Sequence, residues 1–389
     1  MFAARILIRH RIVCSAISRQ SITESERMTH VAVTGARGFL GWHTRSALVS
    51  AGHEIRAISV GEGFNQEEAH RALEGSSRLI HIAGVNRGSD REVGEGNLVF
   101  ARQMALALAR TAAPPRVIVN ANSTQIGNGS VYGEAKKRAS EVLRAAAESV
   151  GAEYVDVHLP NLFGEHGRPF YNSVVATFCH LLASGEQPSV DQDKELQLLH
   201  AQDAADLLTG VSPGGDGGAS PVLVSDILRR LAVIAQLYSG GEIPDVASAL
   251  DRNLFNTYRS FTILASARIE LQRRSDVRGS FFEIVRAHGG QGQSSFSTTA
   301  PGISRGDHFH RRKIERFAVL SGRAVISMRR LFTNEILEFS VSGAAPAAID
   351  MPTMWAHKIT NTGSDELSTS FWSNEIFDPE SPDTFAEAV

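Results

Sequence analysis

Two groups of residues have types and spacings suited to chemistry, and they lie far apart along the sequence. In the segment DHFHRRKIE, His308 and His310 alternate and Glu315 follows after a short excursion. Side chains alternate along a strand, so a strand here would place both imidazoles on one face. His357, in MPTMWAHKITN, is a fourth candidate ligand. Three imidazoles and a carboxylate suit zinc, iron, manganese or nickel, and we expect a divalent metal here, with zinc favoured.

The second group is the pair Tyr132 and Lys136 in VYGEAKK, four residues apart at the start of a predicted helix. This spacing places both side chains on one helix face. A nearby ammonium group favours the tyrosinate, which makes Tyr132 a usable general acid or base near neutral pH. Ser123, at the end of the preceding strand, can hydrogen-bond a substrate oxygen. Such pairs occur by chance on helix surfaces, but the place of this one after a glycine-rich turn favours catalysis.

The glycine-rich turn is TGARGFLG, in which Gly35, Gly38 and Gly41 have the spacing found beneath a bound pyrophosphate. The first glycine permits the tight turn, the second lets the backbone approach the phosphates, and the third allows close helix–strand packing. The following helix N-terminus offers free N–H groups and a partial positive charge. The sequence therefore predicts a dinucleotide site at the end of the first strand.

The cofactor type follows from the end of the second strand, where NAD enzymes carry an acidic residue for the ribose. That strand ends near Ile58 and Ser59, with no acid, so we place Ser59 beside the cofactor. Arg37 and Arg56 could neutralise a 2′-phosphate, which favours NADPH. The alternative is that both arginines are solvated surface charges.

The order of predicted strands and helices divides the chain into two parts. Strands alternate with helices up to about residue 266, which predicts a parallel sheet covered on both faces. Beyond that point short alternating runs predict an antiparallel barrel or sandwich. We place a nucleotide-binding domain at 28–262 and an all-β domain at 263–389. The predicted strands are His30–Thr34, His53–Val60, Leu79–Ala83 and Val117–Asn120, and the helices Thr44–Ala51, Gln66–Leu73, Asn97–Ala112, Tyr132–Val150, Val224–Leu237 and Ile243–Leu254, with Pro213–Pro221 as a surface loop.

Composition excludes several classes of protein. Of 389 residues, 42% are hydrophobic and 21% charged, as in soluble globular proteins, and a charge of −3 gives no reason to expect nucleic acid or a membrane surface as partner. Cys14 and Cys179 allow no disulfide framework, which predicts a reducing, cytoplasmic setting. The arginine-rich residues 1–27 resemble a transit peptide or a poor export signal. A start codon placed too early is the explanation that we favour.

Several motifs together carry a family resemblance. TGARGFLG, HIAGVN, Ser123, YGEAK and PNLFG resemble the extended short-chain dehydrogenase/reductases that act on nucleotide-activated sugars. The run STQIG lacks the Asp-Glu pair of the sugar-nucleotide dehydratases, so dehydration is not expected. A short stretch before HIAG indicates that one strand–helix unit is missing. The resemblance implies a Rossmann-type fold, cofactor contacts from Gly35, Arg37, Gly38, Phe39, Leu40, Gly41, Ser59, Ala83, Gly84, Tyr132 and Lys136, and substrate contacts from Asn161, Arg168 and Asn172.

The second half resembles the cupins. Residues 302–322 match the first cupin motif at every position, and Pro352, His357 and Asn361 match the second, but Met354 replaces its glycine. SDVRGSFFEIVR also resembles the cupin 3,5-epimerases of deoxysugar nucleotides, which implies a substrate contact from Arg278. Those enzymes need no metal and use a tyrosine acid, but no tyrosine follows Tyr258 here. Proton shuttles would then come from His288, Lys313, Glu283 or metal-bound water.

From Met28 onward the chain resembles the CapF-type family of bifunctional capsular-polysaccharide enzymes, through stretches such as PGISRGDHFHRRKIERF and NEIFDPESPDTF. The resemblance implies C3 epimerisation of a UDP-linked 4-keto-deoxyaminosugar by the cupin. NADPH-dependent reduction at C4 follows, giving UDP-N-acetyl-6-deoxy-L-talosamine, and the enzyme is expected to be a homodimer. One alternative is a reductase alone, with the cupin as a binding or dimerisation module. Another is a non-enzymatic NADPH sensor.

Overall fold

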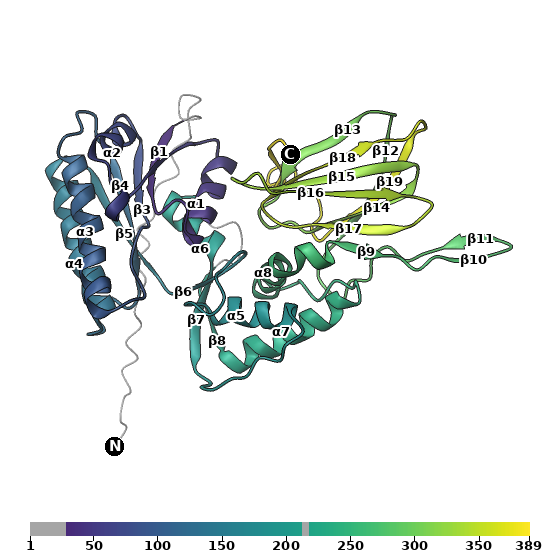
Figure 1. Ribbon diagram of the computed structural model, residues 1–389, viewed down its shortest axis with the longest axis horizontal. Coiled ribbons are helices and arrows are strands. Elements are labelled where there is room, and N and C mark those ends of the chain that lie inside the picture. The colour runs from purple at the N-terminus through teal and green to yellow at the C-terminus, as the bar shows by residue number, and fades with distance from the viewer. Residues whose placement is uncertain (1–28, 212–217) are drawn as a thin grey trace, which may run out of the picture.

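The computed structural model describes residues 29–211 and 218–389. The expectations for residues 1–27, and most of the loop predicted at Pro213–Pro221, lie outside these residues. Figure 1 shows a layered α/β half, a helical lobe beneath it and a half made of strands. Within the described residues, none of the helices has the length and apolarity needed to span a membrane.

The first half is built on a parallel sheet with the strand order β2-β1-β3-β4-β5. Alternate side chains of β1 enter separate cores, because Ala32 packs with α2, α3 and α4 while Val31 and Val33 pack with α1 and α6. Helices therefore cover both faces, as the sequence predicts (Figure 1). The elements are β1 (His30–Thr34), α1 (Phe39–Ser50), β2 (Glu54–Ile58), the 3-10 helix η2 (Gly61–Gly63), α2 (Gln66–Leu73), β3 (Arg78–His81), α3 (Asp90–Leu108), β4 (Val117–Ser123), α4 (Val131–Ser149), β5 (Glu153–Leu159) and α6 (Ala201–Thr209).

The strand order explains where a ligand can bind. The chain leaves β1 toward β2 and then returns past β1 to β3, so the order reverses between β1 and β3. In sheets of this kind, a crevice for ligands opens at the carboxyl ends of the strands at that point. Within the described residues no strand lies beyond β2, in agreement with the predicted loss of one strand–helix unit.

A smaller lobe completes the first half around its own apolar core. It comprises β6 (Asn161–Phe163), α5 (Val174–Ala183), β7 (Glu195–His200), β8 (Ser220–Leu223), α7 (Val224–Ser239) and α8 (Ala249–Ser266). The helix predicted at Ile243–Leu254 is wrong at its start, since Ile243 pairs with Ala287 in a β-bridge. The helix begins instead at Ala249, after Ser248, whose hydroxyl accepts a hydrogen bond from the Asp251 N–H at 3.0 Å.

The second half consists of antiparallel strands in two facing sheets, ordered β12-β19-β14-β17-β9 and β16-β15-β18-β13-β20. This agrees with the predicted all-β fold. A core of Val319, Ile326, Ile349, Trp355 and other apolar side chains draws on both sheets. The strands are β9 (Arg268–Glu270), β10 (Arg274–Asp276), β11 (Gly279–Phe281), β12 (Gln293–Thr299), β13 (Ser304–Phe309), β14 (Glu315–Ser321), β15 (Arg323–Arg330), β16 (Ile336–Ser342), β17 (Ala347–Met351), β18 (Trp355–Asn361), β19 (Leu367–Ser373) and β20 (Phe385–Ala386).

The chain passes from the first half to the second without a linker, and the two halves are in contact. The helix α8 ends at Ser266 and β9 joins the first sheet of the second half directly afterwards, so the boundary proposed at 262/263 falls inside α8. Trp42 of α1 packs with Leu331 and Met354, and its indole N–H donates to the Leu331 carbonyl at 3.1 Å. The helix that follows the glycine-rich turn therefore rests directly on the β-domain.

A buried polar cluster lies at the same interface. The carboxylate of Glu165 accepts a hydrogen bond from the Thr353 hydroxyl at 2.7 Å and lies 3.1 Å from the His200 imidazole. Burial alone would raise the pKa of Glu165, but His200 and His43 outweigh it and lower this pKa to about 2. The interface therefore holds an ionised carboxylate that contacts both halves.

Candidate functional site

The glycine cradle has the geometry that the spacing of its residues predicts. Gly35 has a φ of +68°, and a Cβ there would lie 2.8 Å from the Ala83 nitrogen. At Gly41 a Cβ would lie 2.0 Å from the Gly35 carbonyl oxygen, so a side chain would push α1 away from β1. Within the described residues no side chain caps the first turn of α1, and its first turn has no acidic residue. The N–H groups at this end are thus available to a phosphate.

The candidate reductase residues meet at the carboxyl end of β4. Ser123 ends this strand, and α4 starts after Ser130, whose hydroxyl accepts from the Gly133 N–H at 3.0 Å. Because α4 begins here, Tyr132 and Lys136 lie in its first two turns, and both side chains face the end of β4. The Lys136 ammonium donates to the Ala121 carbonyl at 2.7 Å. The side chains of Ser123, Tyr132 and Lys136 line a single cavity of about 790 Å³.

The electrostatics of this cavity differ at Tyr132 from what the sequence predicts. Burial lowers the pKa of Lys136 to about 8, against the opposing effect of Asp156. Burial raises the pKa of Tyr132, and its hydrogen bond with Ser123 offsets this only in part. Burial therefore opposes the tyrosinate that the sequence predicts and keeps the phenol of Tyr132 protonated before the reaction. A protonated phenol suits the donation of a proton to a reduced carbonyl.

The same cavity collects most of the predicted cofactor and substrate residues. Arg37 and Ser59 are both exposed and lie outside the described lining of the cavity. Sequence reasoning did not single out Asn86, Asn122 or Tyr171, although Asn86 ends HIAGVN, Asn122 precedes Ser123 and Tyr171 lies in the segment GRPFYNS expected to contact the substrate. The predicted residues that line the cavity are Gly35, Gly38, Phe39, Leu40, Gly41, Ala83, Gly84, Ser123, Tyr132, Lys136, Asn161, Arg168 and Asn172.

The mouth of the cavity is bridged by polar contacts. The Tyr171 hydroxyl donates to the Asn86 side-chain carbonyl at 2.9 Å. Arg87 donates to the carbonyls of Phe170 and Tyr171 at 2.9 and 3.0 Å, and the Arg168 guanidinium lies 5.0 Å from the Tyr171 ring centre. Cationic and aromatic groups thus surround the entrance.

The candidate metal ligands come from both sheets of the β-domain. His308 on β13 lies opposite His357 on β18, whereas Glu315 begins β14 in the facing sheet. One ligand atom from each of these residues and from His310 lies within 4.8 Å of the others. The Glu315 carboxylate is 3.0 Å from the His310 Nε2 and 3.6 Å from the His357 Nε2. The structure therefore assembles all four predicted ligands.

The protonation states and outer contacts of this cluster suit a cation. Burial and its neighbours lower the pKa of His308 to about 4, and burial also lowers the pKa of His357. The Nδ1 atoms of His310 and His357 contact the carbonyls of Asp383 at 2.5 Å and Trp355 at 3.1 Å. Both buried Nε2 atoms face the Glu315 carboxylate and, among the described residues, have no other polar partner. Imidazoles oriented through Nδ1, with Nε2 turned toward a shared centre, are the arrangement that metal ligands adopt.

Glu315 completes the fit. Burial would raise the pKa of its carboxyl group, but contacts with His310 and His357 outweigh burial and hold the pKa well below its usual range. An ionised carboxylate among three imidazoles is a donor set whose charge a divalent ion would neutralise. The donor set therefore fits zinc or a related ion.

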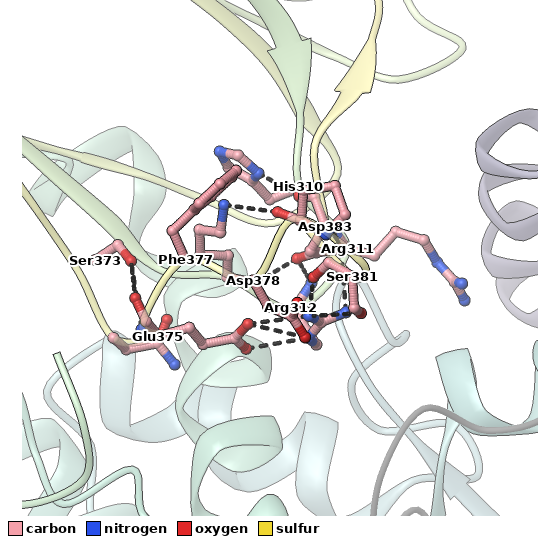
Figure 2. Close-up of polar contacts among 12 residues, drawn as sticks. His310, Arg311, Arg312, Ser373, Glu375, Phe377, Asp378, Ser381 and Asp383 are labelled. Carbon is pink, nitrogen blue, oxygen red and sulfur yellow. Dashed lines mark hydrogen bonds and ion pairs between the residues drawn. The ribbon is translucent and has the colours of Figure 1, made fainter. Parts of the chain in front are cut away.

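Asp383 is an organising residue that sequence reasoning missed. Its carboxylate accepts hydrogen bonds from the N–H groups of Arg311, Arg312 and Lys313 at 3.1, 2.9 and 2.8 Å. Figure 2 shows how this C-terminal segment holds the turn after His310, with the Arg312 side chain paired to Glu375. The segment NEIFDPESPDTF, which contains Glu375 and Asp383, therefore stabilises the turn that follows His310.

None of the predicted shuttles Lys313, His288 and Glu283 is in the described lining of the cavity beside the metal cluster. The Lys313 ammonium donates to the Pro382 carbonyl at 2.8 Å. His288 lies at the surface against Glu242, and Glu283 pairs with Arg286. Arg278 pairs with Asp276 on the hairpin β10–β11, which projects from the molecule in Figure 1. A cavity of about 430 Å³ beside the cluster is lined instead by Ser297, Arg305, Gly306, His308, Glu315, Phe317, His357, Ile359, Thr369 and Phe371.

Comparison with known proteins adds relatives to this geometry. The NAD dependent epimerase/dehydratase family matches residues 31–220, and the polysaccharide biosynthesis C-terminal domain matches residues 274–385. A UDP-2-acetamido-2,6-beta-L-arabino-hexul-4-ose reductase from Pseudomonas aeruginosa is 32% identical over 92% of this chain and 98% of its own length. The crystal structure of the capsular polysaccharide assembling protein CapF from Staphylococcus aureus covers 92% of this chain and all of its own, with 31% identity and a TM-score of 0.57. A structure of CapF with the inhibitor 3-isopropenyl-tropolone gives 30% identity and a TM-score of 0.51.

Proposed function

Because the chain belongs to the CapF-type family of bifunctional capsular-polysaccharide enzymes, we propose that it reduces the C4 ketone of a UDP-linked 4-keto-deoxyaminosugar after epimerising C3. One observation carries the reductase step. The glycine cradle and the residues Ser123, Tyr132 and Lys136 line one cavity, so a nicotinamide and a ketone can meet there.

The chain's own residues have defined tasks in the reduction. NADPH supplies the hydride. Ser123 hydrogen-bonds the ketone oxygen, and the protonated phenol of Tyr132 donates its proton to that oxygen as charge develops. Lys136, held by the Ala121 carbonyl, keeps a positive charge beside the phenol and stabilises the phenolate that remains.

NADPH in place of NADH is part of this proposal. The exposed residues at the end of β2 include Ser59 and no acid before Glu62. Arg56 donates to the Glu74 carbonyl at 2.7 Å, so Arg37 is the cation that we assign to the 2′-phosphate. Both arginines were candidates on sequence grounds alone.

The epimerase step is assigned to the metal cluster. A C3 proton is acidic only while C4 is a ketone, so epimerisation has to precede reduction. His308, His310, Glu315 and His357 would hold a divalent ion, zinc being favoured, which supplies Lewis-acid stabilisation of negative charge on the substrate. Arg305, on the wall of the adjoining cavity, would bind the substrate diphosphate.

A homodimer would place the hairpin β10–β11 against a second copy. The tip residue Val277 is fully exposed and Phe281 is mostly exposed, so both would gain from an apolar partner. Light scattering should give a mass of twice 42.0 kDa. Removal of the hairpin should give the monomer, and a dimer that survives its removal contradicts this part of the proposal.

The test of the reductase is NADPH oxidation by the purified enzyme with a 4-keto UDP-deoxyaminosugar. We expect a product that carries two more hydrogens than the substrate, and a slower reaction with NADH. Absence of oxidation with either cofactor would contradict the proposal. The alternative, a reductase whose β-domain only binds or dimerises, is favoured by the surface ion pairs of His288 and Glu283, which engage both predicted shuttles outside the metal cluster.

A further inference from the structure

The carboxylate of Asp156, on the edge strand of the parallel sheet, accepts more hydrogen bonds than is usual for a residue near the surface. Asp156 lies on β5, where its carboxylate accepts from Asn120 at 2.9 Å and from Asn122 at 3.0 and 3.1 Å. The Ser140 hydroxyl donates to it at 3.0 Å, and the His158 imidazole lies 3.2 Å away. Burial would raise the pKa of Asp156, but these contacts outweigh it and lower the pKa, so the group is ionised.

The donors belong to the two elements that carry the candidate reductase residues. Asn122 uses its side-chain carbonyl to accept the Ser123 N–H at 2.9 Å while its amide group donates to Asp156. Ser140 lies on α4, one turn beyond Lys136. The carboxylate therefore ties the end of β4 to α4 from behind the cavity.

Charge adds a second effect on the same residues. Burial lowers the pKa of Lys136 to about 8, and Asp156 is the negative group that opposes this. An amide in place of the carboxylate would therefore lower the lysine pKa further. The other titratable groups around the pair come from β3, α4 and β5 and are His81, Tyr132, Arg144, Tyr154 and His158.

We propose that Asp156 is a positioning residue of the reductase, which fixes β4 against α4 and so holds Ser123 and Lys136 in register with the substrate. The proposal rests on the proposed reductase function. Displacements near 1 Å in such sites cost up to about 100-fold in rate. An apolar side chain at position 156 would be enough to pack this edge strand. The cluster of donors around the carboxylate therefore points to a role beyond folding.

The test compares variants in the complete enzyme under saturating NADPH. Asp156→Asn should lower kcat by roughly 10- to 100-fold and change the KM for NADPH by much less, since the glycine-rich turn beneath the cofactor lies outside this network. The loss of activity at high pH should move to lower pH, because the lysine loses its negative neighbour. A purely structural role would leave this limb of the pH profile in place.

Two further variants separate geometry from charge. Asn122→Ala keeps the carboxylate, so kcat should fall while the high-pH limb stays. If Asp156 acts through Asn122, the double variant should lose little more in kcat than the worse single variant. Tyr154→Phe removes a hydroxyl that lies 2.9 Å from the Ser140 hydroxyl and donates weakly to Asp156 at 3.4 Å, but it keeps every Asn122 contact, so its kcat should fall less than that of Asn122→Ala.

The outcomes distinguish this inference from the proposed function. A wild-type enzyme without turnover would overturn both. Wild-type turnover with an unchanged kcat and high-pH limb in Asp156→Asn would overturn the positioning role alone, as would losses that multiply in the double variant. If Asp156→Asn fails to fold, an unchanged kcat in Asn122→Ala has the same consequence.

Discussion

Met354 offers a sharp test of how the two halves fit together. It stands where the second cupin motif has glycine, and its φ of +59° is one that side chains rarely adopt. Its side chain is nevertheless fully buried, between Trp42, Phe309 and Leu331. Its N–H also donates to the carbonyl of the candidate ligand His310 at 2.7 Å. The methionine therefore combines backbone strain with apolar packing across the interface.

These two effects predict how two variants compare in stability. Met354→Ala removes the packing and keeps the strain, which should cost about 2–5 kcal/mol of unfolding free energy. Met354→Gly also loses the buried Cβ, worth about 0.8 kcal/mol, but it relieves roughly 1–2 kcal/mol of left-handed strain. The more flexible unfolded chain of the glycine variant offsets about 0.4–1 kcal/mol of that relief. The two variants should therefore be about equally stable, although glycine is the less stable residue at a position without this strain.

Urea unfolding followed by tryptophan fluorescence measures this difference. The matched control is Ile326, buried in β15 with ordinary strand geometry, where glycine should be less stable than alanine by about 0.5–1 kcal/mol. An alanine variant at Met354 that exceeds the glycine variant in stability by as much as it does at Ile326 would refute the reasoning.

Three other predictions follow from the sites. His308→Ala should abolish stoichiometric metal binding, measured by elemental analysis of the purified protein; full occupancy in the variant would contradict the ligand assignment. Ser59→Asp should weaken NADPH binding at least tenfold through repulsion of the 2′-phosphate, as measured by calorimetry, and an unchanged affinity would show that Ser59 is far from the cofactor. Burial lowers the pKa of His81 to about 3, so the folded state resists its protonation, and stability should fall as pH drops below about 6.5. His81→Asn should show a shallower fall across pH 6.5–4.5, and an unchanged slope would contradict this assignment.

Local sequence signals predicted the parts of each site that adjacent residues build. The glycines of TGARGFLG occupy one turn and the pair Tyr132 and Lys136 one helix face, so their spacing determines their geometry. The ligands within DHFHRRKIE are close in sequence, and the short turn after His310 brings Glu315 back to them from the facing sheet. The period of a strand or a helix is enough for such predictions. The elements that carry them were predicted for the same reason.

Contacts between distant segments could not be predicted in this way. Asp383 holds the turn after His310 from near the end of the chain, and Asp156 reaches Asn122 through strand pairing. Asp156 belongs to none of the quoted motifs, and Asp383 lies in the quoted stretch NEIFDPESPDTF without a role that its spacing predicts, because both roles depend on which segments are neighbours in space. The placement of Arg278 on a projecting hairpin likewise depends on tertiary structure.

The order of the two reactions is tested most directly by proton NMR of the 4-keto UDP-sugar with enzyme in D2O and no NADPH. The two-site account predicts deuterium at C3, both with the wild type and with Tyr132→Phe, although the variant should oxidise no NADPH when the cofactor is added. Absence of deuterium, together with NADPH oxidation by the wild type, would contradict the account and leave a reductase with an attached binding domain.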